Sequence, residues 1–165
     1  MYLLDTGVVF ELRKARAGGT DAGFASWAAG LSRQNLFISA ITLLELGNGA
    51  ARVARGDKAA GLALQEWIDT KVLGAFDGRI LPVDTAVVRR RSQLPYTDAR
   101  DGLIAATAVE HGLTLATGNP GAFKAGRIKV LNPWTYRAEA ADEDGDWRQA
   151  AKAGPQWLKN LFVRA

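Results

Sequence analysis

Three acidic residues, Asp5, Glu45 and Asp101, stand where catalytic carboxylates would be expected. Asp5 ends the first predicted strand, whereas Glu45 and Asp101 lie in the predicted first turns of two helices. If both helices start at the edge where the strands end, the three carboxylates converge and raise one another's pKa values unless a cation neutralises them. Mg²⁺ or Mn²⁺, held by few protein oxygens and several waters, suits such a site. Such an ion can activate water and stabilise the charge of an in-line phosphoryl displacement.

Two of these acids also have a purely structural explanation. Asp5 could cap the helix that follows it, with Thr6 as a competing cap. The spacing Thr42-x-x-Glu45 fits a capping box at the start of a helix. Each residue alone is therefore weak evidence, and the functional prediction rests on the three acids together.

The third acid lies in a short acidic segment before an Ala-rich run. Asp98 and Asp101 open the predicted helix over residues 101–111, where the helix dipole favours negative charge. Either residue could therefore act only as a cap. Gly112 follows His111 at the expected helix end.

The composition narrows the chemistry that the chain can perform. There is one histidine and no cysteine, so a two-histidine acid–base mechanism and a thiolate zinc site are both excluded. Hydrolytic chemistry would have to depend on carboxylates. The formal net charge of +4 is a mild bias towards polyanionic partners, although arginine runs such as residues 89–91 are typical of solvated faces. No apolar run is long enough for a membrane span and no secretory signal is recognised, so we expect a cytoplasmic protein.

Short apolar runs alternate with amphipathic segments along the chain. This alternation predicts an α/β fold whose mostly parallel sheet is covered on both faces, with the site at the carboxyl ends of the strands. The predicted strands are 2–4, 36–39, 79–83, 113–116 and 128–131. The predicted helices are 8–14, one from 21, 42–54, 58–73, 84–94 and 101–111.

The last part of the chain differs from the rest. Residues 1–134 form the predicted domain, and residues 135–165 form an extension with an acidic stretch followed by Trp157 and Phe162. The extension is either a short amphipathic helix that docks on the domain or on a partner, or a partly ordered tail.

The chain resembles the PIN-domain family, specifically the VapC and FitB-like toxins of type II toxin–antitoxin systems. The matching stretches occur in family order and cover residues 1–134. They are 3–6 (LLDT), 38–42 (ISAIT) with Glu45, 78–82 (GRILP), 101–108 (DGLIAATA), 113–117 (LTLAT) and 131–134 (LNPW).

The resemblance implies a three-layer fold and a Mg²⁺- or Mn²⁺-dependent endoribonuclease. Acids at the places of Asp5, Glu45 and Asp101 would hold the metal, and the cut would leave a 5′-phosphate and a 3′-hydroxyl. Thr6 and Thr117 would orient ligands or water. The resemblance also implies a homodimer and a small cognate antitoxin that blocks the site and tethers the toxin to operator DNA.

Two positions depart from the family pattern. Gly7 stands where the family often has Asn, and Asn119 stands where it often has a fourth acid. Asn119 can still ligate through oxygen or a bridging water, but it brings no charge. Asp98, three residues before Asp101, is a candidate to compensate as a weaker ligand.

These departures motivate a rival reading, in which the protein binds RNA or a partner without turnover. Asp5-Thr6-Gly7 also matches the motif of dimeric aspartic proteases, but those are β-rich and the helical remainder does not fit. Arg100, beside Asp101, is a candidate contact to RNA phosphates. The RNA target itself is not encoded in any recognisable motif.

Overall fold

An all-parallel sheet runs through the centre of the structure, a computed structural model that describes residues 1–15 and 19–137. Within those residues the sheet has five strands in the order β3-β2-β1-β4-β5. The strands are β1 (Tyr2–Leu4), β2 (Leu36–Ser39), β3 (Ile80–Leu81), β4 (Thr114–Ala116) and β5 (Val130–Leu131). Each predicted strand is confirmed, although β3, β4 and β5 are shorter than the apolar runs that contain them.

The first strand lies in the middle of the sheet. Leu4 pairs with Ile38 of β2 on one side and with Ala116 of β4 on the other. All three strands therefore end at the same level. The polar residues that follow them, Asp5 and Thr117, come out at one edge, next to Ser39 at the end of β2.

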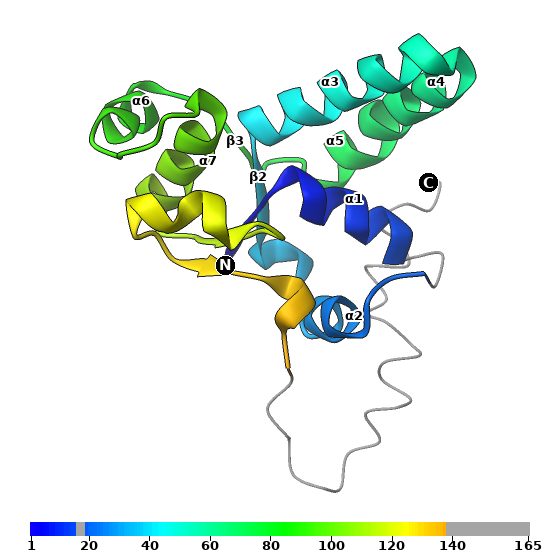
Figure 1. Cartoon of the computed structure of the whole chain (residues 1–165). Coiled ribbons are helices and arrows are strands. Elements are labelled where there is room, and N and C mark those ends of the chain that lie inside the picture. The colour runs from blue at the N-terminus through cyan, green and yellow to red at the C-terminus, as the bar shows by residue number, and fades with distance from the viewer. Residues whose placement is uncertain (16–18, 138–165) are drawn as a thin grey trace, which may run out of the picture.

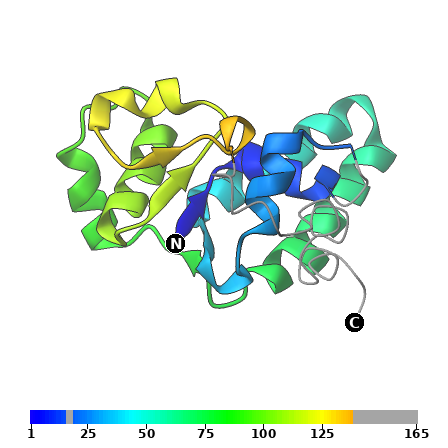
Figure 2. The ribbon, with the colours of Figure 1, turned by 90° about the horizontal axis from the view of Figure 1, so that it is seen from below.

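Helices cover both faces of the sheet, which gives the expected three layers (Figure 1). One group is α1 (Thr6–Ala15), α2 (Ala22–Ala29), α3 (Ala40–Gly56), α4 (Lys58–Trp67) and α5 (Leu73–Ala75); the other is α6 (Thr85–Ser92) and α7 (Ala99–Glu110). Figure 2 shows the two groups on opposite sides of the strands. The shorter helical segments are η1 (Arg33–Asn35), η2 (Ile68–Val72), η3 (Pro120–Gly126) and η4 (Pro133–Thr135).

The core is divided by the sheet into two clusters. Leu4 belongs to the cluster formed with α1, α2, α3 and α4, whereas Leu3 belongs to the cluster formed with α7 and η3. Successive strand residues point to opposite faces, so both residues of this dipeptide are fully buried. This double burial explains why the strands read as unbroken apolar runs in the sequence.

The helix that carries Glu45 starts earlier than predicted, and the predicted capping box is wrong. α3 begins at Ala40, and its N-cap is Ser39, whose side chain accepts a hydrogen bond from the Thr42 amide. Thr42 therefore lies inside the helix. Glu45 lies in the second turn, not the first as predicted, so its carboxylate does not cap the helix.

Most of the other helix predictions agree with the structure. Asp84 caps α6, as predicted. The predicted helix 58–73 is present, but the π-helical segment η2 interrupts it and α5 extends it to Ala75. α3 and α4 form a hairpin that projects from the sheet (Figure 1), in which a Cβ atom on Gly61 would overlap Ala54.

No helix within residues 1–15 and 19–137 is long and apolar enough to cross a membrane. Most of the predicted extension over residues 135–165 lies outside the described residues, which end at Arg137. The division into residues 1–134 and 135–165 stays a prediction.

Candidate active site at the carboxyl edge of the sheet

Asp5 is fixed by hydrogen bonds to both carboxylate oxygens. Its Oδ1 accepts from the Thr6 amide at 2.7 Å, and its Oδ2 accepts from the Thr117 hydroxyl at 2.6 Å. Its own amide donates to the Ala116 carbonyl at 3.0 Å. Thr6 lies in the first turn of α1 and is not the cap that the sequence offered as an alternative. The central strand and its neighbour β4 therefore set both the position and the orientation of Asp5.

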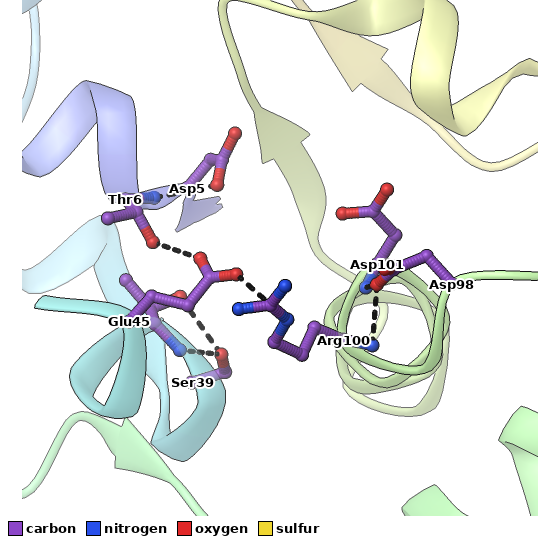
Figure 3. Close-up of polar contacts among 8 residues, drawn as sticks. Asp5, Thr6, Ser39, Glu45, Asp98, Arg100 and Asp101 are labelled. Carbon is purple, nitrogen blue, oxygen red and sulfur yellow. Dashed lines mark hydrogen bonds and ion pairs between the residues drawn. The ribbon is translucent and has the colours of Figure 1, made fainter. Parts of the chain in front are cut away.

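Glu45 reaches the same edge from α3. Its Oε2 accepts from the Thr6 hydroxyl at 2.5 Å, and its Oε1 lies 3.9 Å from Nε of Arg100. Thr6 therefore links the two acids, since its amide contacts Asp5 and its hydroxyl contacts Glu45. Figure 3 shows Arg100 extending from α7 towards Glu45, across the space that Asp5 and Asp101 border.

Ser39 and Thr42 anchor α3 beneath Glu45, a role that the sequence interpretation missed. Both residues are fully buried. Their hydroxyls lie 2.9 Å apart, and the Thr42 hydroxyl donates to the Leu4 carbonyl at 3.2 Å. The start of α3 is thus tied to the residue before Asp5. A Ser that ends an apolar strand and precedes a helical run was the available signal for this anchor.

Asp101 lies in the first turn of α7, as predicted, and Asp98 caps that helix. Asp98 Oδ1 accepts from the amides of Arg100 and Asp101, at 2.8 and 3.0 Å. These two hydrogen bonds lower the pKa of Asp98. The cap interpretation of Asp98 is confirmed, and its role as a weaker ligand stays a prediction.

The pKa of Asp101 is shifted in the opposite direction. Partial burial is the largest cause and raises the pKa of Asp101. The charges of Asp98, Asp5 and Glu45 raise this pKa further, whereas Arg100 lowers it. Asp101 therefore feels the other two acids of the predicted set through space. These contributions to the pKa agree with the arrangement in Figure 3, where Asp5, Glu45 and Asp101 border the same space.

The loop after β4 supplies two more of the predicted residues. Thr117 is buried, and its hydroxyl accepts from the Asn119 amide at 3.1 Å while donating to Asp5. Asn119 precedes η3, and its side chain makes no capping hydrogen bond there. Gly7 is exposed, and a Cβ atom at that position would meet nothing within 4 Å. The larger side chain often found there in the family would therefore fit.

The donor atoms suit a hard, hydrated cation. Among residues 1–15 and 19–137, no three acidic or histidine side chains form a ready-made metal cluster, and Arg100 partly compensates Glu45. Carboxylate oxygens are the protein ligands that Mg²⁺ prefers, and the ion is usually bound by one or two of them while it keeps several of its waters. Asp5, Glu45 and Asp101 are the residues that could hold it.

Comparison with known proteins agrees with this geometry. The profile of the PIN domain matches residues 2–128, which is most of the chain. The chain belongs to the PIN-domain family. The resemblance read from the sequence and the three-layer fold are both confirmed.

Curated members of the PIN-domain family are similar over nearly their whole length. Toxin FitB of Neisseria gonorrhoeae is 37% identical over 142 residues, covering 81% of this chain and 99% of FitB. A VapC ribonuclease of Sinorhizobium fredii is 34% identical, covering 81% of this chain and 98% of that protein. Among solved structures, FitAB bound to a DNA fragment superposes with a TM-score of 0.72 at 34% identity, covering 84% of this chain and 99% of that one.

Proposed function

We propose that the protein is a Mg²⁺- or Mn²⁺-dependent endoribonuclease that cuts RNA to leave 5′-phosphate and 3′-hydroxyl ends, and that it acts as the toxin of a toxin–antitoxin pair. The observation that carries the proposal is the arrangement of Asp5, Glu45 and Asp101 around one space at the carboxyl edge of the sheet (Figure 3), with Asp5 held by Thr117 and Glu45 by Thr6. The name of the similar VapC ribonuclease supports the choice of RNA as substrate.

The hydrogen bonds of the site assign a task to each residue. Thr117 and the Thr6 amide hold both oxygens of Asp5 in one orientation, and the Thr6 hydroxyl directs Glu45 towards the same space. Such fixed donors remove the cost of reorganising the carboxylates during the reaction. When bound, the divalent ion supplies a hydrolytic water at neutral pH and charge stabilisation for the phosphodiester.

Arg100 supplies positive charge next to these acids. Its side chain is more than half exposed and meets Glu45 only at the limit of an ion pair, so it is free to turn to a phosphate of the RNA. An arginine can bind a phosphate through two parallel hydrogen bonds. We therefore propose Arg100 as an RNA contact that positions the backbone without reading its sequence.

The proposed partners follow from the similar proteins. FitB is named a toxin, and FitAB is a complex bound to DNA. We propose that this chain likewise binds a small cognate antitoxin that covers the site and connects it to operator DNA, and that it forms a homodimer. Co-expression with the neighbouring small gene, followed by light scattering of the free protein and of the complex, would determine both assemblies.

The test of the activity is cleavage of total RNA and of a folded transfer-RNA panel by the antitoxin-free protein in Mg²⁺ or Mn²⁺, beside an EDTA control. The variant is Asp5→Asn, and the matched control is Asp21→Asn, because Asp21 caps α2 and Asn keeps a side-chain oxygen that can accept the same hydrogen bonds. We expect discrete metal-dependent cuts with 5′-phosphate ends, lost in Asp5→Asn and retained in Asp21→Asn.

The same experiment separates the rival function, RNA or partner binding without turnover. The neutral Asn119 is the observation that favours this rival. If the folded protein cuts nothing in either metal but retains RNA, and Asp5→Asn retains it equally, the nuclease proposal fails and the binding function replaces it.

A further inference from the structure

The segment that leads into α7 is held by a single guanidinium group. Arg91, at the end of α6, donates to the carbonyl oxygens of Leu94 at 3.2 Å, Tyr96 at 2.7 Å and Asp98 at 3.5 Å. One side chain thus contacts three carbonyls of the segment that connects α6 to α7. The interpretation of residues 89–91 as a solvated run is wrong for Arg91, which is half-buried and donates hydrogen bonds to three carbonyls.

The guanidinium of Arg91 also lies against the backbone next to Asp101. A Cβ atom on Gly102 would overlap Nε and Cζ of Arg91, so only glycine lets the group occupy this place. Gly102 is buried in the first turn of α7, directly after the acid. Arg91 therefore contacts the chain on both sides of Asp98 and Asp101.

A second contact fixes the far side of the same segment. The Tyr96 hydroxyl donates to the Phe123 carbonyl in η3 at 3.0 Å, and the two rings pack edge to face. Tyr96 thereby joins the segment to the helical turn that follows Asn119. Arg91 and Tyr96 together set where α7 begins, and the beginning of α7 sets where Asp101 lies.

We propose that Arg91, seated on Gly102, is a positioning residue that holds Asp101 at the active site. The kinetic consequence of this proposal rests on the proposed nuclease function, whereas its structural consequence does not. Among the described residues, the polar contact between α7 and these two acids is the Arg100–Glu45 ion pair at 3.9 Å, and Asp101 itself contacts neither acid, so its distance from Asp5 and Glu45 depends on how the start of α7 is held. A displacement of about 1 Å at a catalytic group can cost ~100-fold in rate.

The central experiment compares Arg91→Ala with Arg89→Ala, an exposed arginine on the same helix. We expect Arg91→Ala to lower kcat by about 10- to 100-fold with little change in KM, because substrate binding is retained and alignment is lost. We also expect Mn²⁺, titrated alone, to bind ~10-fold more weakly, a readout independent of turnover. Arg89→Ala should change neither.

Two further variants address the mechanism. Arg91→Lys keeps the charge but replaces the planar guanidinium, which uses two nitrogens for these carbonyls, by a single ammonium nitrogen. It should therefore restore only part of kcat. Gly102→Ala should reproduce the defect with Arg91 intact. In the double variant Arg91→Ala/Gly102→Ala the two effects should not add, because the same contact is already lost.

Hydrogen exchange distinguishes the failure of this proposal from failure of the nuclease function. Loss of the Arg91 contacts should speed exchange at the amides of Arg100 and Asp101, which the Asp98 cap protects. If the native protein cuts nothing, the nuclease function fails while exchange and Mn²⁺ binding still test the positioning. If folded Arg91→Ala equals Arg89→Ala in exchange, Mn²⁺ binding and kcat, the positioning role is overturned. Should Arg91→Ala not fold, Arg91→Lys and Gly102→Ala decide by the same measurements.

Discussion

The Thr117 hydroxyl donates to Asp5 Oδ2 across 2.6 Å, although the two residues are 112 positions apart in the chain. The bond exists because β1 and β4 are neighbours in register, so that the residues after Leu4 and Ala116 emerge side by side. Thr117 also accepts from the Asn119 amide. The contact with Asn119 therefore fixes the orientation of the Thr117 hydroxyl, and the hydrogen bond from this hydroxyl in turn orients the carboxylate of Asp5.

Thr117→Val removes this bond while keeping the shape of the side chain. Partners that orient a metal-ligating group commonly contribute about 10- to 100-fold in metal affinity or activity, and we expect cleavage to fall by that amount. The measurement is single-turnover cleavage at several Mn²⁺ concentrations. Thr70→Val, on the exposed side of η2, is the control, and equal activity of the two variants would contradict the assigned role.

Asp101→Asn should stabilise the metal-free protein while abolishing cleavage. The pKa of Asp101 is raised in the folded state, so its negative charge opposes folding above that pKa and this cost disappears as the pH falls through it. The group is largely solvated, so we expect a modest rise in Tm, on the order of 1 °C, in EDTA at pH 7. Mg²⁺ should then raise the Tm of the native protein more than that of the variant. A lower Tm for Asp101→Asn in EDTA would be the contrary result.

Asp98 should show the opposite dependence on pH. Its pKa is lowered by the hydrogen bonds from the Asp101 and Arg100 amides. The stabilisation from its charge is therefore complete above the ordinary value of 3.8 and disappears as the pH falls through the lowered one. Urea unfolding of native protein and Asp98→Asn should differ at pH 7 and converge towards pH 3. A difference that does not depend on pH would show that the charge is irrelevant to the cap.

Arg100→Ala should weaken RNA binding about equally for all sequences. An arginine that contacts a phosphate releases a counterion, so its loss should reduce the slope of log K against log salt by about 1. The measurement uses the Asp5→Asn background, in which RNA stays intact, with Arg89→Ala as the control. An unchanged slope would mean that Arg100 only compensates Glu45.

The strands and the acids that end them were predictable because they depend on local pattern. A buried parallel strand requires an apolar run, and the residue after it lies at the carboxyl edge. Asp5 was therefore predictable at this edge from the strand pattern, whereas Thr117 was expected at the site only through the resemblance to the PIN-domain family. Asp101 was placed correctly too, because acids at a helix start and an Ala-rich run after them are both visible in one stretch.

The remaining features depend on contacts between distant segments. The predicted start of α3 is too late because Ser39 is both the last residue of β2 and the N-cap of α3, whereas the Thr42-x-x-Glu45 spacing favoured a later start. The contact of Glu45 with Thr6 spans 39 positions. Arg91 resembles Arg89 and Arg90 in sequence, and only the packing of α6 on α7 distinguishes it from them.

The position of β1 at the centre of the sheet also affects when the site can form during synthesis. Asp5 is made before its partner Thr117, which follows 112 residues later. At about 5–20 residues per second, that interval is on the order of ten seconds. During that interval, the nascent chain on the ribosome contains Asp5 and later Glu45. It cannot yet pair β1 with β4. The order of the strands thus delays assembly of the site until most of the domain has been translated.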